Sequence, residues 1–147
     1  MSVAAPRILI VDDDVALAKS LAAMLEVAGA FETRTVHCAA DAVAAAIEHV
    51  PTIVFLDIEL PDMSGYDVAK LLRQHAHLRT TRLIALTDSI EHPGREDARA
   101  AGFERYLVKP VTLAELQKVL RRSVSIGNGK GGVVRGDARS DIYRGLP

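Results

Sequence analysis

Short apolar runs recur along the chain, separated by stretches of mixed character. The run from Arg7 to Val11 consists almost wholly of aliphatic residues, which is typical of a strand buried on both faces of a sheet. The run over residues 33–36 is more polar and indicates a strand at the edge of the sheet. Three further strands are predicted over residues 52–56, 82–86 and 105–108.

Between these runs the apolar positions recur every three or four residues, which is the spacing of helices that pack on one face. Hydroxyl residues at two of the expected starts, Ser64 and Thr112, are suited to capping free backbone N–H groups. Helices are predicted over residues 17–28, over 41–49, from Ser64 onward, up to an end at Gly102, and over 112–122.

Strand and helix therefore alternate five times along the chain. Short connections and right-handed crossovers turn such an order into a parallel sheet with helices on both faces. We predict an α/β fold, a flavodoxin-like doubly wound (βα)5 sandwich with strand order 2-1-3-4-5. Beyond residue 122 the composition shifts toward glycine and arginine, which predicts one domain over residues 1–122 and a flexible tail over 123–147.

Composition narrows the classes of function. The formal net charge of −1 provides no basic field for nucleic acid, so we expect no direct nucleic-acid binding. The single cysteine, Cys38, allows no internal disulfide. No apolar run reaches the length that crosses a bilayer, and no signal segment is recognisable at the start. These features predict a cytoplasmic protein with no membrane partner.

Side chains suited to metal and phosphate chemistry follow four of the five predicted strands. In a doubly wound sheet, ligands bind outside the carboxyl ends of the strands, so these side chains should meet in one crevice. Clustered carboxylates repel one another unless a lysine or a hard cation such as Mg²⁺ neutralises them. A carboxylate is also a competent nucleophile toward phosphorus. The residues are Asp12, Asp13 and Asp14 after the first strand, Asp57 after the third, Thr87 after the fourth and Lys109 after the fifth.

Four motifs at these strand ends resemble the receiver domain of bacterial response regulators. They are IVDDD from Ile10, LDIELPDMSG from Leu56, LTD from Leu86 and YLVKP from Tyr106, and the similarity covers roughly residues 7–122. The resemblance implies a two-component or phosphorelay protein that signals through protein contact and is not a classical enzyme, although it assists its own phosphorylation and dephosphorylation. Its target is not readable from the sequence, and a phosphorylation-dependent homodimer stays open.

The same resemblance implies that Asp57 accepts a phosphoryl group from a histidine kinase or phosphotransfer protein, with Mg²⁺ as the cofactor. The side chains of Asp13 and Asp57 are then metal ligands, and the backbone carbonyl of Glu59 completes the protein's share of the coordination. Asp12 acts on the metal largely through water. Lys109 is expected to contact the aspartyl phosphate.

A conformational switch is implied as well. Thr87 is expected to hydrogen-bond the phosphoryl group, and the ring of Tyr106 to turn inward as Thr87 moves. The bond between Lys109 and Pro110 is expected to be cis, a form that only proline tolerates at low cost. Asp14 has the simpler role of capping the helix that follows it.

One position departs from the usual receiver pattern. The residue after Thr87 is commonly small in the family, whereas here it is Asp88. A carboxylate at this place crowds a phosphoryl dianion. We therefore expect Asp88, together with Glu59, to tune the lifetime of the phosphorylated state through charge repulsion or by handling the attacking water.

The strongest alternative is a phosphatase of the haloacid dehalogenase type, because the segment from Ile10 to Val15 resembles the DxDxV opening of that family. Asp12 would then be the nucleophile and Asp14 the acid. That family needs a further acidic motif after the lysine strand, and none follows Lys109 here. A third alternative is a degenerate receiver that serves only as an interaction module, although nothing essential is missing from the acceptor site.

Overall fold

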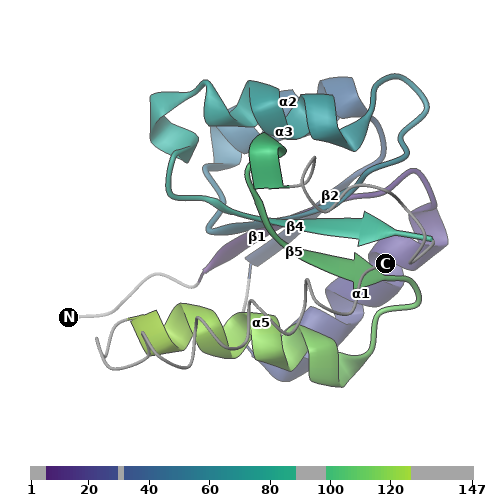
Figure 1. The fold of residues 1–147 in the computed structure, drawn as a ribbon. Coiled ribbons are helices and arrows are strands. Elements are labelled where there is room, and N and C mark those ends of the chain that lie inside the picture. The colour runs from purple at the N-terminus through teal and green to yellow at the C-terminus, as the bar shows by residue number, and fades with distance from the viewer. Residues whose placement is uncertain (1–5, 30–31, 89–98, 127–147) are drawn as a thin grey trace.

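The computed structural model describes residues 6–29, 32–88 and 99–126. The five strands and the first, second, third and fifth helices follow one another in the predicted order (Figure 1). In the part of the chain that is described, no helix combines the length and apolar character needed to cross a membrane. The elements are β1 (Arg7–Val11), α1 (Val15–Ala28), β2 (Glu32–Val36), α2 (Ala39–His49), β3 (Ile53–Asp57), α3 (Gly65–Arg73), the 3-10 turn η1 (Ala76–Leu78), β4 (Arg82–Thr87), β5 (Phe103–Val108) and α5 (Leu113–Ile126).

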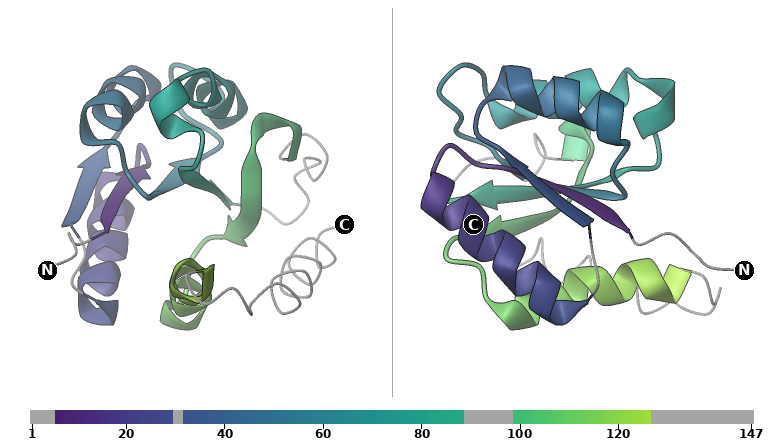
Figure 2. Two further views of the ribbon diagram at one scale, coloured as in Figure 1. Left: turned by 90° about the vertical axis from the view of Figure 1, so that its left-hand side faces the viewer. Right: turned by 180° about the vertical axis from the view of Figure 1, so that it is seen from behind.

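The five strands form one parallel sheet in the order β2-β1-β3-β4-β5, which confirms the predicted topology. Helices α2 and α3 cover one face, and α1 and α5 cover the other, so the molecule has three layers (Figures 1 and 2). The polar run that predicted an edge strand is β2, which lies beside β1 at one end of the strand order and is partly exposed.

Two apolar clusters lie on opposite faces of the sheet. Alternate residues of a strand point to opposite sides, so Leu9 of β1 packs toward α2 and α3, whereas Ile10 packs toward α1 and α5. Phe55 of β3 belongs to the second cluster, and its neighbour Leu56 to the first. Because both faces are covered, the central strands need apolar residues at every position, which explains their continuous apolar runs.

Strand pairing continues one residue further than predicted at two strand ends. Asp57 pairs with Leu86, and Thr87 pairs with Val108, so Asp57 and Thr87 are the last residues of β3 and β4. Their side chains are therefore positioned by the sheet itself. The fixed geometry of paired strands defines the edge at which these two residues meet the ends of β1 and β5.

Helix α5 continues to Ile126, so the prediction that it ends at residue 122 was wrong, and residues 123–126 are helical rather than part of a tail. The chain has no glycine or proline between residue 122 and Gly127 that would stop the helix. The rest of the predicted tail, residues 127–147, lies outside the described residues. So do residues 89–98, which include most of the predicted fourth helix. Its last turn is described and ends at Gly102, where φ is +104°, a conformation that favours glycine.

Gly65 brings the start of α3 against the end of β3. Its backbone N–H donates to the carbonyl of Ile58 at 2.9 Å, which closes the loop between the two elements. A Cβ atom on this glycine would collide with the backbone carbonyl of Asp57 and with Cα of Ile58. The close approach therefore needs a residue without a side chain.

Replacing Gly65 by Ala should lower the free energy of unfolding by roughly 1–3 kcal/mol, because backbone atoms must shift to admit the methyl group. Urea unfolding followed by circular dichroism measures this change. Lys70→Ala, an exposed substitution on the same helix, is the matched control and should stay within about 0.5 kcal/mol of the wild type. Equal stability of the two variants would contradict the close-packing argument.

Candidate functional site

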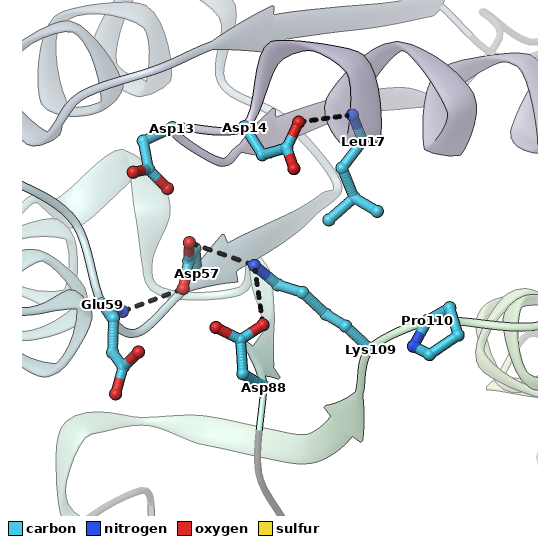
Figure 3. A pocket seen from close by; sticks show the side chains of 8 residues that line it. All are labelled: Asp13, Asp14, Leu17, Asp57, Glu59, Asp88, Lys109 and Pro110. Carbon is cyan, nitrogen blue, oxygen red and sulfur yellow. Dashed lines mark hydrogen bonds and ion pairs between the residues drawn. The ribbon is translucent and has the colours of Figure 1, made fainter.

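A pocket opens at the carboxyl ends of the strands, where the loops after β1, β3, β4 and β5 converge (Figure 3). Its volume is about 580 Å³. Residues from each of those loops point into it, so segments far apart in the sequence contribute to one site. The lining residues are Asp13, Asp14, Leu17, Asp57, Glu59, Asp88, Lys109 and Pro110.

Three carboxylates gather at this end of the sheet, and two of them, Asp13 and Asp57, line the pocket. One oxygen each of Asp12, Asp13 and Asp57 lies within 4.8 Å of the others. Asp12 and Asp57 are buried, with 0% and 3% of their surface exposed, whereas Asp13 is exposed. The structure thus brings together the three acidic side chains that the sequence predicted as a metal site.

The two oxygens of Asp57 have different partners. Oδ1 accepts a hydrogen bond from the backbone N–H of Glu59 at 2.9 Å, and Oδ2 accepts one from Nζ of Lys109 at 3.2 Å. Burial raises the pKa of Asp57 to about 6, although the Glu59 N–H and the Lys109 ammonium act in the opposite direction. The negative charge of Asp12 adds to the increase. Asp57 is therefore a more basic carboxylate than an exposed aspartate.

Lys109 is the cation of the site. Its Nζ lies 2.9 Å from Oδ2 of Asp12, 3.2 Å from Oδ2 of Asp57 and 3.8 Å from Oδ1 of Asp88. Burial by itself would lower the pKa of this lysine, but the hydrogen bonds and charges of Asp12 and Asp57 outweigh it, and the net shift is upward. The ammonium therefore stays charged at neutral pH and holds two buried carboxylates together.

A divalent cation fits the remaining charge. The cluster holds three carboxylates, and the ammonium of Lys109 contacts two of them, Asp12 and Asp57, so the negative charge is only partly balanced. Oδ2 of Asp12 is buried, and the ammonium of Lys109 lies 2.9 Å from it. Carboxylate oxygens are the ligands that Mg²⁺ prefers. The site can accept Mg²⁺ at Asp12, Asp13 and Asp57.

The other predicted residues lie around this centre. Thr87 is buried at the end of β4, and its carbonyl accepts the backbone N–H of Lys109 at 2.8 Å. Asp88 is exposed at the pocket rim and faces the ammonium of Lys109 (Figure 3). Tyr106 is 4% exposed and points into the core beneath α3. The roles expected for these residues stay predictions.

Two local features of the sequence are confirmed. Asp14 is the N-cap of α1, and its carboxylate accepts the backbone N–H of Leu17 at 3.1 Å. The Lys109–Pro110 peptide bond is cis, as the resemblance implied. Asp14 therefore lines the pocket without belonging to the carboxylate cluster.

Sequence reasoning missed three residues that support the site. The carboxylate of Asp62, in the loop after β3, accepts the backbone N–H of Ala39 at 2.9 Å and so caps α2 from outside. Nδ1 of His37 lies 2.9 Å from the carbonyl oxygen of Asp12. Tyr66 shares a hydrogen bond with Tyr106. All three contacts join segments that are distant in the sequence, so no local sequence pattern predicts them.

The chain matches the family model described as the response regulator receiver domain over residues 8–121. It is 37% identical over 117 residues to the transcriptional regulatory protein KdpE of Mycobacterium tuberculosis, covering 80% of this chain and 50% of that protein. It is 30% identical over 114 residues to the polar-differentiation response regulator DivK of Brucella ovis, covering 78% of this chain and 92% of DivK. The chain thus spans about half the length of KdpE and nearly all of DivK.

A solved structure shares both fold and sequence with the chain. The receiver domain of the sensor histidine kinase PA1611 from Pseudomonas aeruginosa, with a magnesium ion coordinated in its active-site cleft, aligns with a TM-score of 0.73 and 31% identity. The alignment covers 81% of this chain and 97% of that domain. Neither the family match nor these relatives support the phosphatase alternative with Asp12 as nucleophile.

Asp57→Asn should stabilise the protein in the absence of divalent cations at neutral pH. A folded-state pKa raised from 3.8 to about 6 favours folding at low pH, and this contribution is lost as the pH rises through about 6, so the ionised carboxylate opposes folding at pH 7. Removing it should raise the free energy of unfolding by roughly 1–3 kcal/mol. Urea unfolding without and with Mg²⁺ provides the measurement.

Added Mg²⁺ should stabilise the wild type, because a ligand that binds only the folded state shifts the equilibrium toward it. The stabilisation should be much smaller for Asp57→Asn, which lacks one carboxylate of the cluster. Asp14→Asn is the matched control, since it alters a neighbouring carboxylate outside the cluster, and it should respond to Mg²⁺ like the wild type. An equal gain for Asp57→Asn and the wild type would argue against the assigned metal site.

Proposed function

Because the chain belongs to the response regulator receiver family, we propose that it is switched by phosphorylation of Asp57, with a histidine kinase or a phosphotransfer protein as donor. One observation supports this proposal above the others. Asp57 lies at the end of β3 with a raised pKa, belongs to the acidic cluster and contacts the ammonium of Lys109 at 3.2 Å. Nucleophile, cation and metal ligands of a phosphoryl-transfer site thus occupy one edge of the sheet.

Asp57 acts as the nucleophile. One of its carboxylate oxygens forms the new bond to phosphorus, while the bond from phosphorus to the leaving atom of the donor breaks and the electron pair departs with that atom. The raised pKa makes Asp57 more nucleophilic than an ordinary aspartate, yet a value of about 6 leaves most of it ionised at neutral pH. The hydrogen bond from the Glu59 N–H fixes the direction in which the carboxylate points.

Lys109 stays protonated. Its ammonium neutralises negative charge on the carboxylate of Asp57 before the transfer and on the phosphoryl oxygens after it. Its contacts at 2.9 Å and 3.2 Å with Asp12 and Asp57 place the ammonium within reach of oxygens bound to Asp57. Bound Mg²⁺ would supply the remaining positive charge for the phosphoryl oxygens, held by Asp12, Asp13 and Asp57. The carbonyl of Glu59 is proposed as a further ligand.

Thr87 and Tyr106 are proposed to carry the signal away from the site. Thr87 ends β4 beside the acceptor strand, so its hydroxyl can follow a new phosphoryl oxygen. Tyr106 lies on the neighbouring strand β5, two positions before the residue that pairs with Thr87. A movement of Thr87 would therefore change the surroundings of Tyr106. The protein is proposed to pass its signal on by contact with a partner protein. The chain covers only half of KdpE, so the rest of KdpE does not indicate which protein that partner is.

Incubation with acetyl phosphate and Mg²⁺, followed by intact mass measurement, tests the acceptor. The wild type should gain one phosphoryl group, and Asp57→Asn should gain none, because the amide is not a nucleophile at phosphorus. Omitting Mg²⁺ should abolish the adduct. Loss of the adduct in Asp12→Asn but not in Asp57→Asn would overturn the proposal in favour of the phosphatase alternative. No adduct in the wild type, with a cognate kinase also failing, would favour an interaction module.

Asp88→Ala should lengthen the lifetime of the phosphorylated protein about fivefold, the effect of removing one unit charge that stands roughly 4 Å from a phosphoryl oxygen in water. Both proposed roles predict this direction, because Ala removes the repulsion of the phosphoryl group and also any assistance to the attacking water. Loss of the phosphoryl group after removal of the donor is followed by intact mass.

Asp88→Asn retains the size of the side chain and is the matched variant. A lifetime like that of Asp88→Ala would assign the effect to charge, and a lifetime like the wild type would assign it to occupied space. If neither variant differs from the wild type, Asp88 has no part in setting the lifetime. Glu59→Gln tests the second proposed carboxylate in the same assay and leaves its backbone groups in place.

A further inference from the structure

Tyr106 has a specific partner on the helix that follows the acceptor loop. The hydroxyl groups of Tyr66 and Tyr106 lie 2.7 Å apart, which is the distance of a good O–H···O hydrogen bond. Tyr66 is half-buried in the first turn of α3, and Tyr106 is buried on β5. The ring of Tyr66 also meets Phe103 of β5 edge-on, with ring centroids 6.1 Å apart. Tyr66 thus contacts β5 through both its ring and its hydroxyl.

A short chain of contacts links this pair to Asp57. The backbone N–H of Glu59 donates to Oδ1 of Asp57, and Glu59 forms an isolated bridge with Ser64 at the other end of the same loop. Ser64 is the N-cap of α3, and its Oγ accepts the backbone N–H of Tyr66 at 3.1 Å. The loop that holds the acceptor carboxylate therefore also sets the position of Tyr66.

In the proposed switch Tyr106 has an inward and an outward orientation, and a hydrogen bond from Tyr66 favours the inward one. A tyrosine hydroxyl that leaves water for the core loses its hydration and needs a partner there. The Tyr66 hydroxyl supplies a partner in the inward orientation, whereas water supplies it in an outward one. A net hydrogen bond of ordinary strength corresponds to a factor of about five in such an equilibrium.

We propose that Tyr66 is a positioning residue that holds Tyr106 in its inward orientation before phosphorylation. The unphosphorylated protein then already has Tyr106 mostly in the inward orientation. Phosphorylation stabilises this orientation further. The orientation of Tyr106 in the unphosphorylated protein does not depend on the proposed function. The role of that orientation in a switch does rest on the proposed function.

The test uses the full chain with isotopically labelled tyrosine rings, observed by NMR without Mg²⁺ or a phosphoryl donor. Broadening by a soluble nitroxide reports how far each ring is exposed, and Tyr106→Phe identifies the Tyr106 signal. In the wild type this signal should be protected. In Tyr66→Phe, which keeps the ring of residue 66 and removes its hydroxyl, the exposed population of Tyr106 should rise about fivefold. Equal protection in both proteins, or an exposed Tyr106 in the wild type, would overturn the proposal.

Phe103→Leu is the matched control, because it removes the edge-on ring contact and leaves both hydroxyls in place. It should leave Tyr106 protected. If it exposes Tyr106 as much as Tyr66→Phe does, ring packing and not the hydroxyl positions Tyr106, and the proposal is wrong.

Adding Mg²⁺ and beryllofluoride, an analogue of the phosphoryl group, extends the test to the switch. The Tyr106 signal should change little in the wild type and return toward the protected state in Tyr66→Phe. An unchanged spectrum of Tyr66→Phe would contradict the claim that phosphorylation favours the same orientation of Tyr106 as the hydrogen bond from Tyr66. Failure of the proposed function is separate, since it appears as the absence of an Asp57 adduct in the mass assay while protection of Tyr106 in the resting wild type is unaffected.

Discussion

The ammonium of Lys109 is the group on which the geometry of the site depends. It contacts the buried carboxylates of Asp12 and Asp57 at 2.9 Å and 3.2 Å, and without it these two charges would repel each other in a poorly hydrated place. Burial of the carboxylates is in turn imposed by the covered parallel sheet, which ends at this edge. The fold concentrates negative charge there, and Lys109, which follows the edge strand β5, balances part of it. The remaining negative charge fits the divalent cation that we propose for this edge.

The loop between β3 and α3 is held in place at several points. Its first residues orient Asp57 through the Glu59 N–H, and Asp62 caps α2 through Ala39. Its end, at Gly65, presses against the backbone of β3 and leaves no room for a side chain. These contacts leave the loop little freedom to move independently of β3, α2 and α3. The contact between Tyr66 and Tyr106 extends this connection across α3 to β5.

Much of the fold was readable from the chain because strands buried on both faces must be apolar throughout. The runs at β1, β3 and β4 were recognised on that basis, and the alternation of strands and helices implied the parallel order that the structure has. Helix ends were predicted well where a capping residue marks them, as at Ser64, and poorly at α5, where no breaker follows residue 122. A helix end can be predicted from the sequence only where a capping residue or a helix-breaking glycine or proline marks it.

By itself the sequence determined which side chains stand at the strand ends, since periodicity places the strands and Asp12, Asp57, Thr87 and Lys109 sit at or next to their last residues. It also determined the likeness to receivers, because four motifs in order are specific together. Only the tertiary structure decided how these groups share charge: that burial raises the pKa of Asp57, that Lys109 meets both Asp12 and Asp57, and that Tyr106 has a hydroxyl partner. Burial and distance arise from segments remote in sequence, and no local pattern encodes them.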